Sequence, residues 1–290
     1  MTLALNFARI ISVLAASLML CACGAIKLGY NNIDEVAYWW LDGNVDFENS
    51  QRPQVRQDIA RLHLWHRGNE LPRYVDLLQR MERLASADIT SEQACGFIGD
   101  IRERVGVLST QAEPAAVTLA MSLTPEQLTH LERKYQKINR DYRKEWIDIP
   151  PAEQRAKRVK QLVERSETIY GKLADPQREA VRQQVEQSSF DAQRFMVERQ
   201  RRQQDILQTL QTISSQPIAL AEARNLVRGY LERFNKSPNA TFRAHQETVV
   251  QENCRGIAST HNATTAAQRE NAVKRLRSYQ EDLRELAAQR

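Results

Sequence analysis

This 290-residue sequence contains four cysteines and five histidines. Both residue types can bind a metal ion or act in catalysis. His63 and His66 stand three positions apart, and Cys254 precedes His261 by seven. A tetrahedral zinc site needs three or four converging nitrogen or sulfur ligands, with further groups that orient them. Because local spacing supplies two ligands at most, we expect no metal site.

Sequence motifs for catalysis are missing as well. There is no Gly-rich phosphate loop, no Gly-x-Ser-x-Gly nucleophile turn and no His-Glu-x-x-His helix. Glu126, Glu132 and Glu145 stand among Lys and Arg at helical spacings, which is typical of ion pairs on helix faces rather than of an acid–base pair. We therefore expect a protein that is not an enzyme, with no catalytic residue and no cofactor.

The start of the chain has the three parts of a bacterial lipoprotein signal peptide, in order. A positive charge at Arg9 precedes an apolar core over residues 10–20, and small residues follow at the cleavage site. A membrane-spanning helix needs roughly 20 apolar residues, and this core is too short for that. The sequence thus predicts a cleaved signal peptide over residues 1–22.

Two cysteines compete for the lipidated position. With Cys23, Ala22 precedes the cut and Leu20 stands three places upstream, whereas Cys21 would put the bulky Leu20 at the cut. We therefore predict acylation, palmitate included, at Cys23, which makes membrane lipid the first expected partner. Gly24, rather than Asp, favours an outer-membrane anchor with the protein on the periplasmic face. The alternative is an ordinary secreted protein with a chance cysteine near its cleavage site.

Charge argues against a nucleic-acid partner. The chain has 41 Lys and Arg against 36 Asp and Glu, a net charge of +5, and the two signs are interleaved. Loss of residues 1–22 would remove only Arg9, which leaves +4. Interleaved charge is typical of solvated helix faces rather than of a phosphate-binding stripe.

Removal of the signal peptide and acylation of Cys23 would leave Cys95 and Cys254 as a pair. In an oxidising compartment an even pair indicates a candidate disulfide. Two free thiols buried in helical cores are the other interpretation, since the sequence does not show the distance between them. Both stay open at this point.

Apolar spacing predicts an all-α fold, a multi-helix antiparallel bundle with short connections. Thr90 with Gln93, Thr124 with Gln127, and Thr265 with Gln268 have the pattern of helix-starting capping boxes. A helix from Thr124 should run to about Trp146 and stop before Pro150 and Pro151. The helix after Thr90 should turn one stripe inward: Cys95, Ile98, Ile101, Val105 and Leu108.

We expect a lipidated, aromatic-rich segment over residues 23–50, followed by a helical domain over residues 51–290. The double proline suggests halves at 51–149 and 150–290. The aromatics of the first segment could plug the helical domain or settle at the membrane interface. The plug is favoured, because one helical face collects five residues: Ile33, Val36, Ala37, Trp40 and Leu41.

Several short motifs together resemble a family of proteobacterial lipoproteins that is classed as a domain of unknown function. They are residues 27–32, 38–42, 65–67, 71–74, 198–204 and 252–254. The resemblance covers nearly the whole chain. It implies a lipoprotein, and it brings no activity, substrate or catalytic residue.

A second resemblance is confined to Leu123–Gln127, which is similar to the LTxxQ signature of Spy and CpxP, helical periplasmic proteins that bind unfolded clients or sensor proteins. Leu173–Gln177 keeps the Leu and Gln of a second copy but lacks the Thr. The same residue types also make a good helix start. We expect a binding or scaffolding lipoprotein with an unidentified protein partner. A Spy-like chaperone or stress-sensor partner is the alternative.

Overall fold

The computed structural model describes residues 26–289, so Cys23 and its alternative Cys21 lie outside it. The described residues are helical and contain no strand, which confirms the all-α prediction. The helices are α2 (Ile33–Val45), α3 (Arg52–Asn69), α4 (Leu71–Leu84), α5 (Ser91–Ser122), α6 (Pro125–Trp146), α7 (Pro151–Tyr170), α8 (Asp175–Glu186), α9 (Ala192–Ser214), α10 (Leu220–Asn235), α11 (Ala240–Asn262) and α12 (Ala266–Ala288). No helix in this range is both long and apolar enough to cross a membrane.

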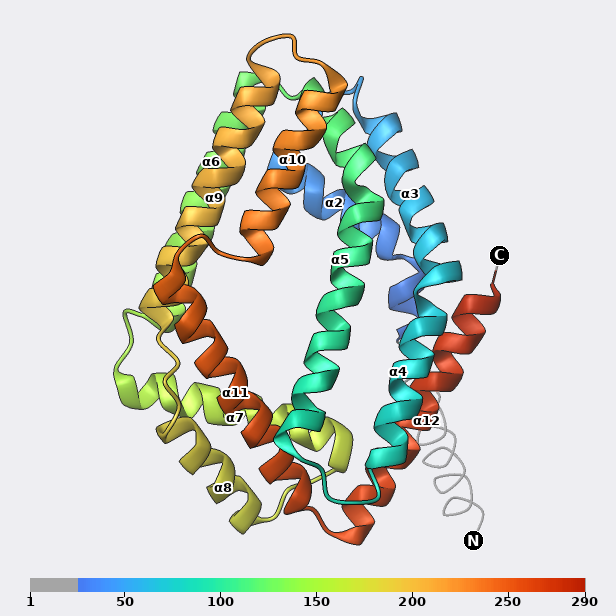
Figure 1. Cartoon of the computed structure of the whole chain (residues 1–290), viewed down its shortest axis with the longest axis vertical. Coiled ribbons are helices and arrows are strands. Elements are labelled where there is room, and N and C mark those ends of the chain that lie inside the picture. The colour runs from blue at the N-terminus through green and yellow to red at the C-terminus, as the bar shows by residue number, and fades with distance from the viewer. Residues whose placement is uncertain (1–25, 290) are drawn as a thin grey trace, which may run out of the picture.

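The helices form an elongated, open frame (Figure 1). Helices α3 and α4 follow one another along one long edge, where α12 lies beside α4, and α6 and α9 lie side by side along the other edge. Helix α5 runs lengthwise between these edges, and α7 and α8 lie at one end. Helices of residues 51–149 therefore pack directly on helices of residues 150–290.

Buried apolar side chains form several small clusters, each of which joins a few helices. One cluster holds α2 and α3 together through Tyr38 and Val55, with Phe47 between these helices. The others lie between α5, α9 and α10, between α4 and α12, and between α7 and α8. Apolar burial is thus distributed around the frame.

The helix starts predicted from capping residues are confirmed. Thr90, Thr124 and Thr265 each accept a hydrogen bond from the backbone of the Gln three residues on, and that Gln accepts one in return. The break at the double proline is also present, since α6 ends at Trp146 and α7 begins at Pro151. These features depend on residues close together in sequence, which is why spacing alone located them.

The inward stripe predicted for α5 is wrong in its middle turns, where Ile101 and Val105 are 42% and 49% exposed. Helix α5 packs on α11 near its start, and on α9 and α10 near its end, through Val117 and Ala120. The exposed turns lie between these two contact regions. Periodicity shows which side of a helix is apolar, and it does not show whether a neighbour covers that side.

Cys95 and Cys254 are joined in a disulfide, with Cα atoms 5.3 Å apart, that links α5 to α11. Cys254 is fully buried and Cys95 is partly exposed. The two cysteines are 159 residues apart in sequence, and the bond holds the first turns of α5 to α11.

The N-terminal aromatic segment packs on the frame with a different face from the one predicted. Tyr38 and Phe47 are buried, whereas Ile33, Val36 and Trp40 are exposed. The turn after α2 explains part of the difference: Asp46 adopts a left-handed backbone conformation, and the chain then returns to pack Phe47 against Tyr38. A single-helix pattern could not anticipate a contact made across this turn.

Candidate binding groove

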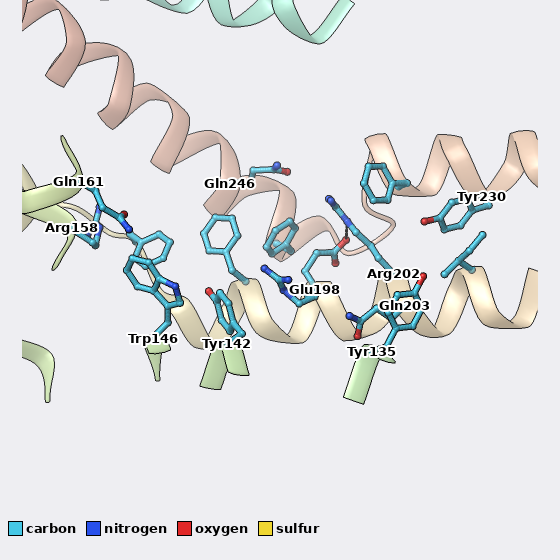
Figure 2. Close-up of a pocket in the computed structure, with 16 residues that line it drawn as sticks. Tyr135, Tyr142, Trp146, Arg158, Gln161, Glu198, Arg202, Gln203, Tyr230 and Gln246 are labelled. Carbon is cyan, nitrogen blue, oxygen red and sulfur yellow. Dashed lines mark hydrogen bonds and ion pairs between the residues drawn. The ribbon is translucent and has the colours of Figure 1, made fainter. Parts of the chain in front are cut away.

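Helices α6, α7, α9, α10 and α11 line a groove with a volume of about 670 Å³ (Figure 2). This volume falls within the range of roughly 300–1,000 Å³ that is usual for ligand sites. We call it the aromatic–arginine groove, after the two side-chain classes that dominate its walls. Its main aromatic residues are Trp146, Phe190, Phe195, Tyr230, Phe234 and Phe242, and its arginines are Arg158, Arg199 and Arg202.

Most of the aromatic rings touch one another in sequence along the wall. Trp146 meets the edge of Phe190 at 6.4 Å between centroids, and Phe190 stacks on Phe195 at 5.3 Å. Phe195 then meets the edge of Phe242 at 5.5 Å. These residues come from α6, the α8–α9 loop, α9 and α11, so the apolar wall exists only when the four segments are assembled.

Each arginine of the groove lies over an aromatic ring. The guanidinium carbon of Arg158 is 4.5 Å from the Phe190 centroid, and that of Arg199 is 4.6 Å from the Tyr142 centroid. Arg202 lies 4.6 Å from the centroid of Phe234. Such stacking is favourable by itself and leaves the guanidinium N–H groups at the ring's edge available for hydrogen bonds.

Glu198 neutralises one of these arginines. It is 4% exposed and accepts hydrogen bonds from Arg201, Arg202 and Ser237. Figure 2 shows its contact with Arg202. Burial acts to raise the pKa of Glu198, but the donated hydrogen bonds and the charge of Arg201 outweigh it, so the pKa lies below its usual value. The carboxylate is therefore ionised and fixes Arg202 in place.

Arg158 and Arg199 have no such carboxylate partner. Arg158 donates a 2.9 Å hydrogen bond to Ser188, and Arg199 contacts the Tyr142 ring; within residues 26–289 neither forms an ion pair. Burial lowers the pKa of Arg158, with Glu252 acting in the opposite direction. Since a guanidinium stays protonated in proteins, the groove carries two positive charges without a direct ion pair among the described residues, and Ser188 links Arg158 to Glu252.

Neutral polar groups complete the lining. The Gln161 and Gln246 amides have no hydrogen-bond partner within the described range, while Gln203 accepts a 2.7 Å bond from Asn139. Burial raises the pKa of Tyr230 to about 12, so its hydroxyl stays protonated at neutral pH. The groove therefore offers apolar rings, two cations and uncharged donors and acceptors to a ligand.

The residues that sequence spacing singled out for metal binding do not come together. His63 and His66 both lie against Tyr30, at ring-centroid distances of 4.8 and 5.9 Å. His261 bonds Tyr170 and the Ala87 carbonyl through its two ring nitrogens, and Cys254 is in the disulfide. Among the described residues, no group of three or more His, Cys, Asp and Glu side chains could hold a metal ion.

The groove itself was not predicted from the sequence. Its signal on α9 is the spacing of Phe195, Arg199 and Arg202, which places the three on one helical face. Residues 198–204 contribute to the family resemblance, which carries no binding role. The other walls come from distant segments, and single-helix periodicity cannot bring them together.

The fold and groove define an all-α protein with a candidate binding site between helices. The chain belongs to a family of unknown function, DUF6279, whose model matches residues 43–223. This match includes α3 to α9, and residues 1–42 and 224–290 lie outside it. Neither the curated proteins nor the solved structures contain a significant match.

Proposed function

We propose that this protein is a lipid-anchored, periplasm-facing binding protein that acts by holding a segment of a partner protein rather than by catalysis. Its anchor would be acylated Cys23 in the outer membrane. Its binding site would be the aromatic–arginine groove, and the preferred ligand an extended acidic segment with aromatic side chains.

The observation that carries the proposal is that Arg158 and Arg199, which form no direct ion pair within residues 26–289, are stacked over aromatic rings. A ligand carboxylate could form charge-assisted hydrogen bonds with either guanidinium. The rings of Trp146, Phe190 and Phe195 give an apolar surface for aromatic side chains of the ligand. Gln161 and Gln246 could bond its backbone, which favours a peptide over a purely apolar ligand.

A binding titration tests this ligand class. The probes are a dye-labelled peptide in which Asp and Phe alternate and a matched peptide with Lys in place of Asp, followed by fluorescence anisotropy. We expect the acidic peptide to bind, the basic one not to bind, and Arg158→Gln with Arg199→Gln to weaken binding tenfold or more, about 1.4 kcal/mol. Arg140→Gln, an exposed position on α6, is the matched control. Equal binding of both peptides would contradict the proposal.

The second candidate function is a Spy-like chaperone or stress-sensor partner, and Leu123–Gln127 favours it. A groove lined by partly exposed aromatic rings would also suit unfolded segments. A chaperone should suppress aggregation of an unfolded client with little regard to its charge. The binding protein proposed above should discriminate by charge and leave aggregation unchanged, so a light-scattering assay separates the two functions.

A further inference from the structure

Helix α2 and the helical residues 26–31 before it carry an exposed apolar surface, which we call the α2 apolar face. It consists of Leu28, Ile33, Val36, Trp39 and Trp40. Trp39 and Trp40 are the most notable members, because they are 63% and 66% exposed. Single exposed apolar residues are ordinary, but two adjacent tryptophans with three aliphatic neighbours indicate a surface that meets something apolar.

The opposite side of α2 is packed, so the direction of this face is fixed. Tyr38 is buried against Phe47 and Val55, with Leu119 of α5 beside them. Arg56 lies 3.6 Å from the Tyr38 centroid and forms an ion pair with Glu35 at 2.6 Å. In Figure 1, α2 passes behind α5, and Leu119 of α5 packs against its buried side, so the apolar face points away from α5.

The chain just before α2 is also held to the frame. Lys27 forms ion pairs with Asp282 at 3.4 Å and Glu285 at 2.5 Å, both on α12. The Tyr30 hydroxyl bonds His66 of α3 at 2.9 Å. The chain is therefore held to α12 and α3 within five residues of Ile26, the first residue that the structure describes.

Cys23 is three residues before Ile26, the first described residue. Three residues span at most about 10 Å, even when fully extended. Acyl chains on Cys23 would thus bring a lipid bilayer to within about this distance of the chain that leads into α2. The tether is too short to hold the frame away from the membrane.

We propose that the α2 apolar face lies on the bilayer, with Trp39 and Trp40 in its interfacial region. The proposal rests on the lipidation of Cys23 proposed above. Tryptophan favours this region, because its ring is apolar and its N–H group can still reach a polar partner. Glu35, which directly precedes Val36, forms an ion pair with Arg56, and this reduces its charge. The face would hold this side of the frame to the bilayer, and the opposite side would point toward the periplasm.

Quenching by brominated phospholipid tests the contact. Acylated full-length protein is purified from membranes and reconstituted into phosphatidylethanolamine–phosphatidylglycerol vesicles. One variant keeps only Trp40, and the matched control keeps only Trp146 of the groove, with Phe at the other tryptophan positions. We expect brominated lipid to remove about half or more of the Trp40 emission and to leave Trp146 unchanged.

Vesicle flotation of the same samples separates the two proposals. If the protein floats and Trp40 is not quenched, the anchor stands and membrane docking is wrong. If the protein carries no acyl chain and does not float, the proposed anchor itself fails. If Trp40 becomes protected from aqueous acrylamide without lipid, as protein concentration rises, the face pairs with a second copy and membrane docking is overturned.

Discussion

Gln177 and Gln268 bond each other through their side-chain amides, with N···O distances of 2.8 and 3.1 Å. Each stands in the first turn of its own helix, α8 or α12, and accepts a hydrogen bond from the backbone N–H three residues before it. Each also donates to the backbone across the junction: Gln177 to Ala263, and Gln268 to Lys172. Two helix starts are thereby locked together by one pair of amides.

The same device occurs at a second junction. Gln51 and Gln127 bond each other at 3.1 and 2.7 Å, and they donate to the Ser122 and Asp46 carbonyls respectively. Gln127 is the last residue of the LTxxQ-like motif and Gln177 the last of its imperfect copy. In this protein the motif glutamines thus both start a helix and join it to another segment.

Gln177→Ala is expected to reduce the free energy of unfolding by about 2–4 kcal/mol, because it removes hydrogen-bond partners from buried backbone groups and from the Gln268 amide. Chemical denaturation measures this loss. Gln136→Ala, at an exposed position on α6, is the control and should change stability by about 0.5 kcal/mol or less. A similar small effect of Gln177→Ala would mean that the amide pair is not structural.

The helix starts could be predicted from the sequence because a capping box is complete within four residues. The pairing of Gln177 with Gln268 could not, since 91 residues separate them. Ala174 also lacks the hydroxyl of a full capping box, so Leu173–Gln177 is an incomplete copy of the motif. Both five-residue segments end in glutamine, and this residue supplies the bonds that join the helices.

Loss of the disulfide should destabilise the fold strongly. In the entropic account, closing 159 residues restricts the unfolded chain by about 5 kcal/mol, so Cys95→Ala with Cys254→Ala should lose a large part of that amount. Denaturation with and without reductant measures the effect. The double variant should be insensitive to reductant, and a wild-type protein with equal insensitivity would contradict the bond.

Removal of the Glu198 carboxylate should leave Arg202 without an ion pair among the described residues, whereas Arg201 keeps its ion pair with Asp205. Glu198→Gln is expected to cost about 3 kcal/mol or more, because Arg201 and Arg202 lose a partner that is shielded from water. Glu145→Gln is the control: its 2.7 Å ion pair with Lys157 is more exposed, so the loss should be about 1 kcal/mol or less. Equal losses in the two variants would show that burial of Glu198 is unimportant.

Stability should fall between pH 7 and pH 5 partly through His261. Burial lowers the pKa of His261, although its bond to the Ala87 carbonyl opposes this. In the unfolded chain His261 binds a proton near pH 6.5, whereas in the folded protein it binds one only at lower pH. The free energy of unfolding therefore decreases as the pH falls below about 6.5. His261→Gln should make the slope shallower by up to about 1.4 kcal/mol per pH unit, and an unchanged slope would exclude His261 as its source.

Cys23→Ser is expected to abolish labelling by radioactive palmitate in cells and to release the protein from membranes. Serine has no thiol to carry the lipid, and without buried acyl chains the membrane anchor is lost. Cys21→Ser should retain the label. Label that persists in Cys23→Ser and disappears in Cys21→Ser would move the anchor to Cys21.

The candidate site was harder to predict than the fold. Residues on one face of α9, such as Phe195 and Arg199, have a recognisable spacing, but Trp146 and Phe242 join them only through tertiary packing. Ile101 and Trp40 show the same limit of sequence patterns: spacing predicts a packed helix face for each, and each is exposed. Apolar patterning identifies faces, while the partner of each face is decided by the whole frame.

Photo-crosslinking in intact cells tests the central claim most directly. A benzophenone amino acid at Gln246, in the groove, is compared with one at Lys137, an exposed position on α6, in the full chain and in its Cys23→Ser form. A defined envelope protein should crosslink at Gln246 only, through an acidic, aromatic-containing segment, and should be lost with Arg158→Gln and Arg199→Gln. Identical products at both positions, unaffected by the arginine substitutions, would contradict the groove as a binding site.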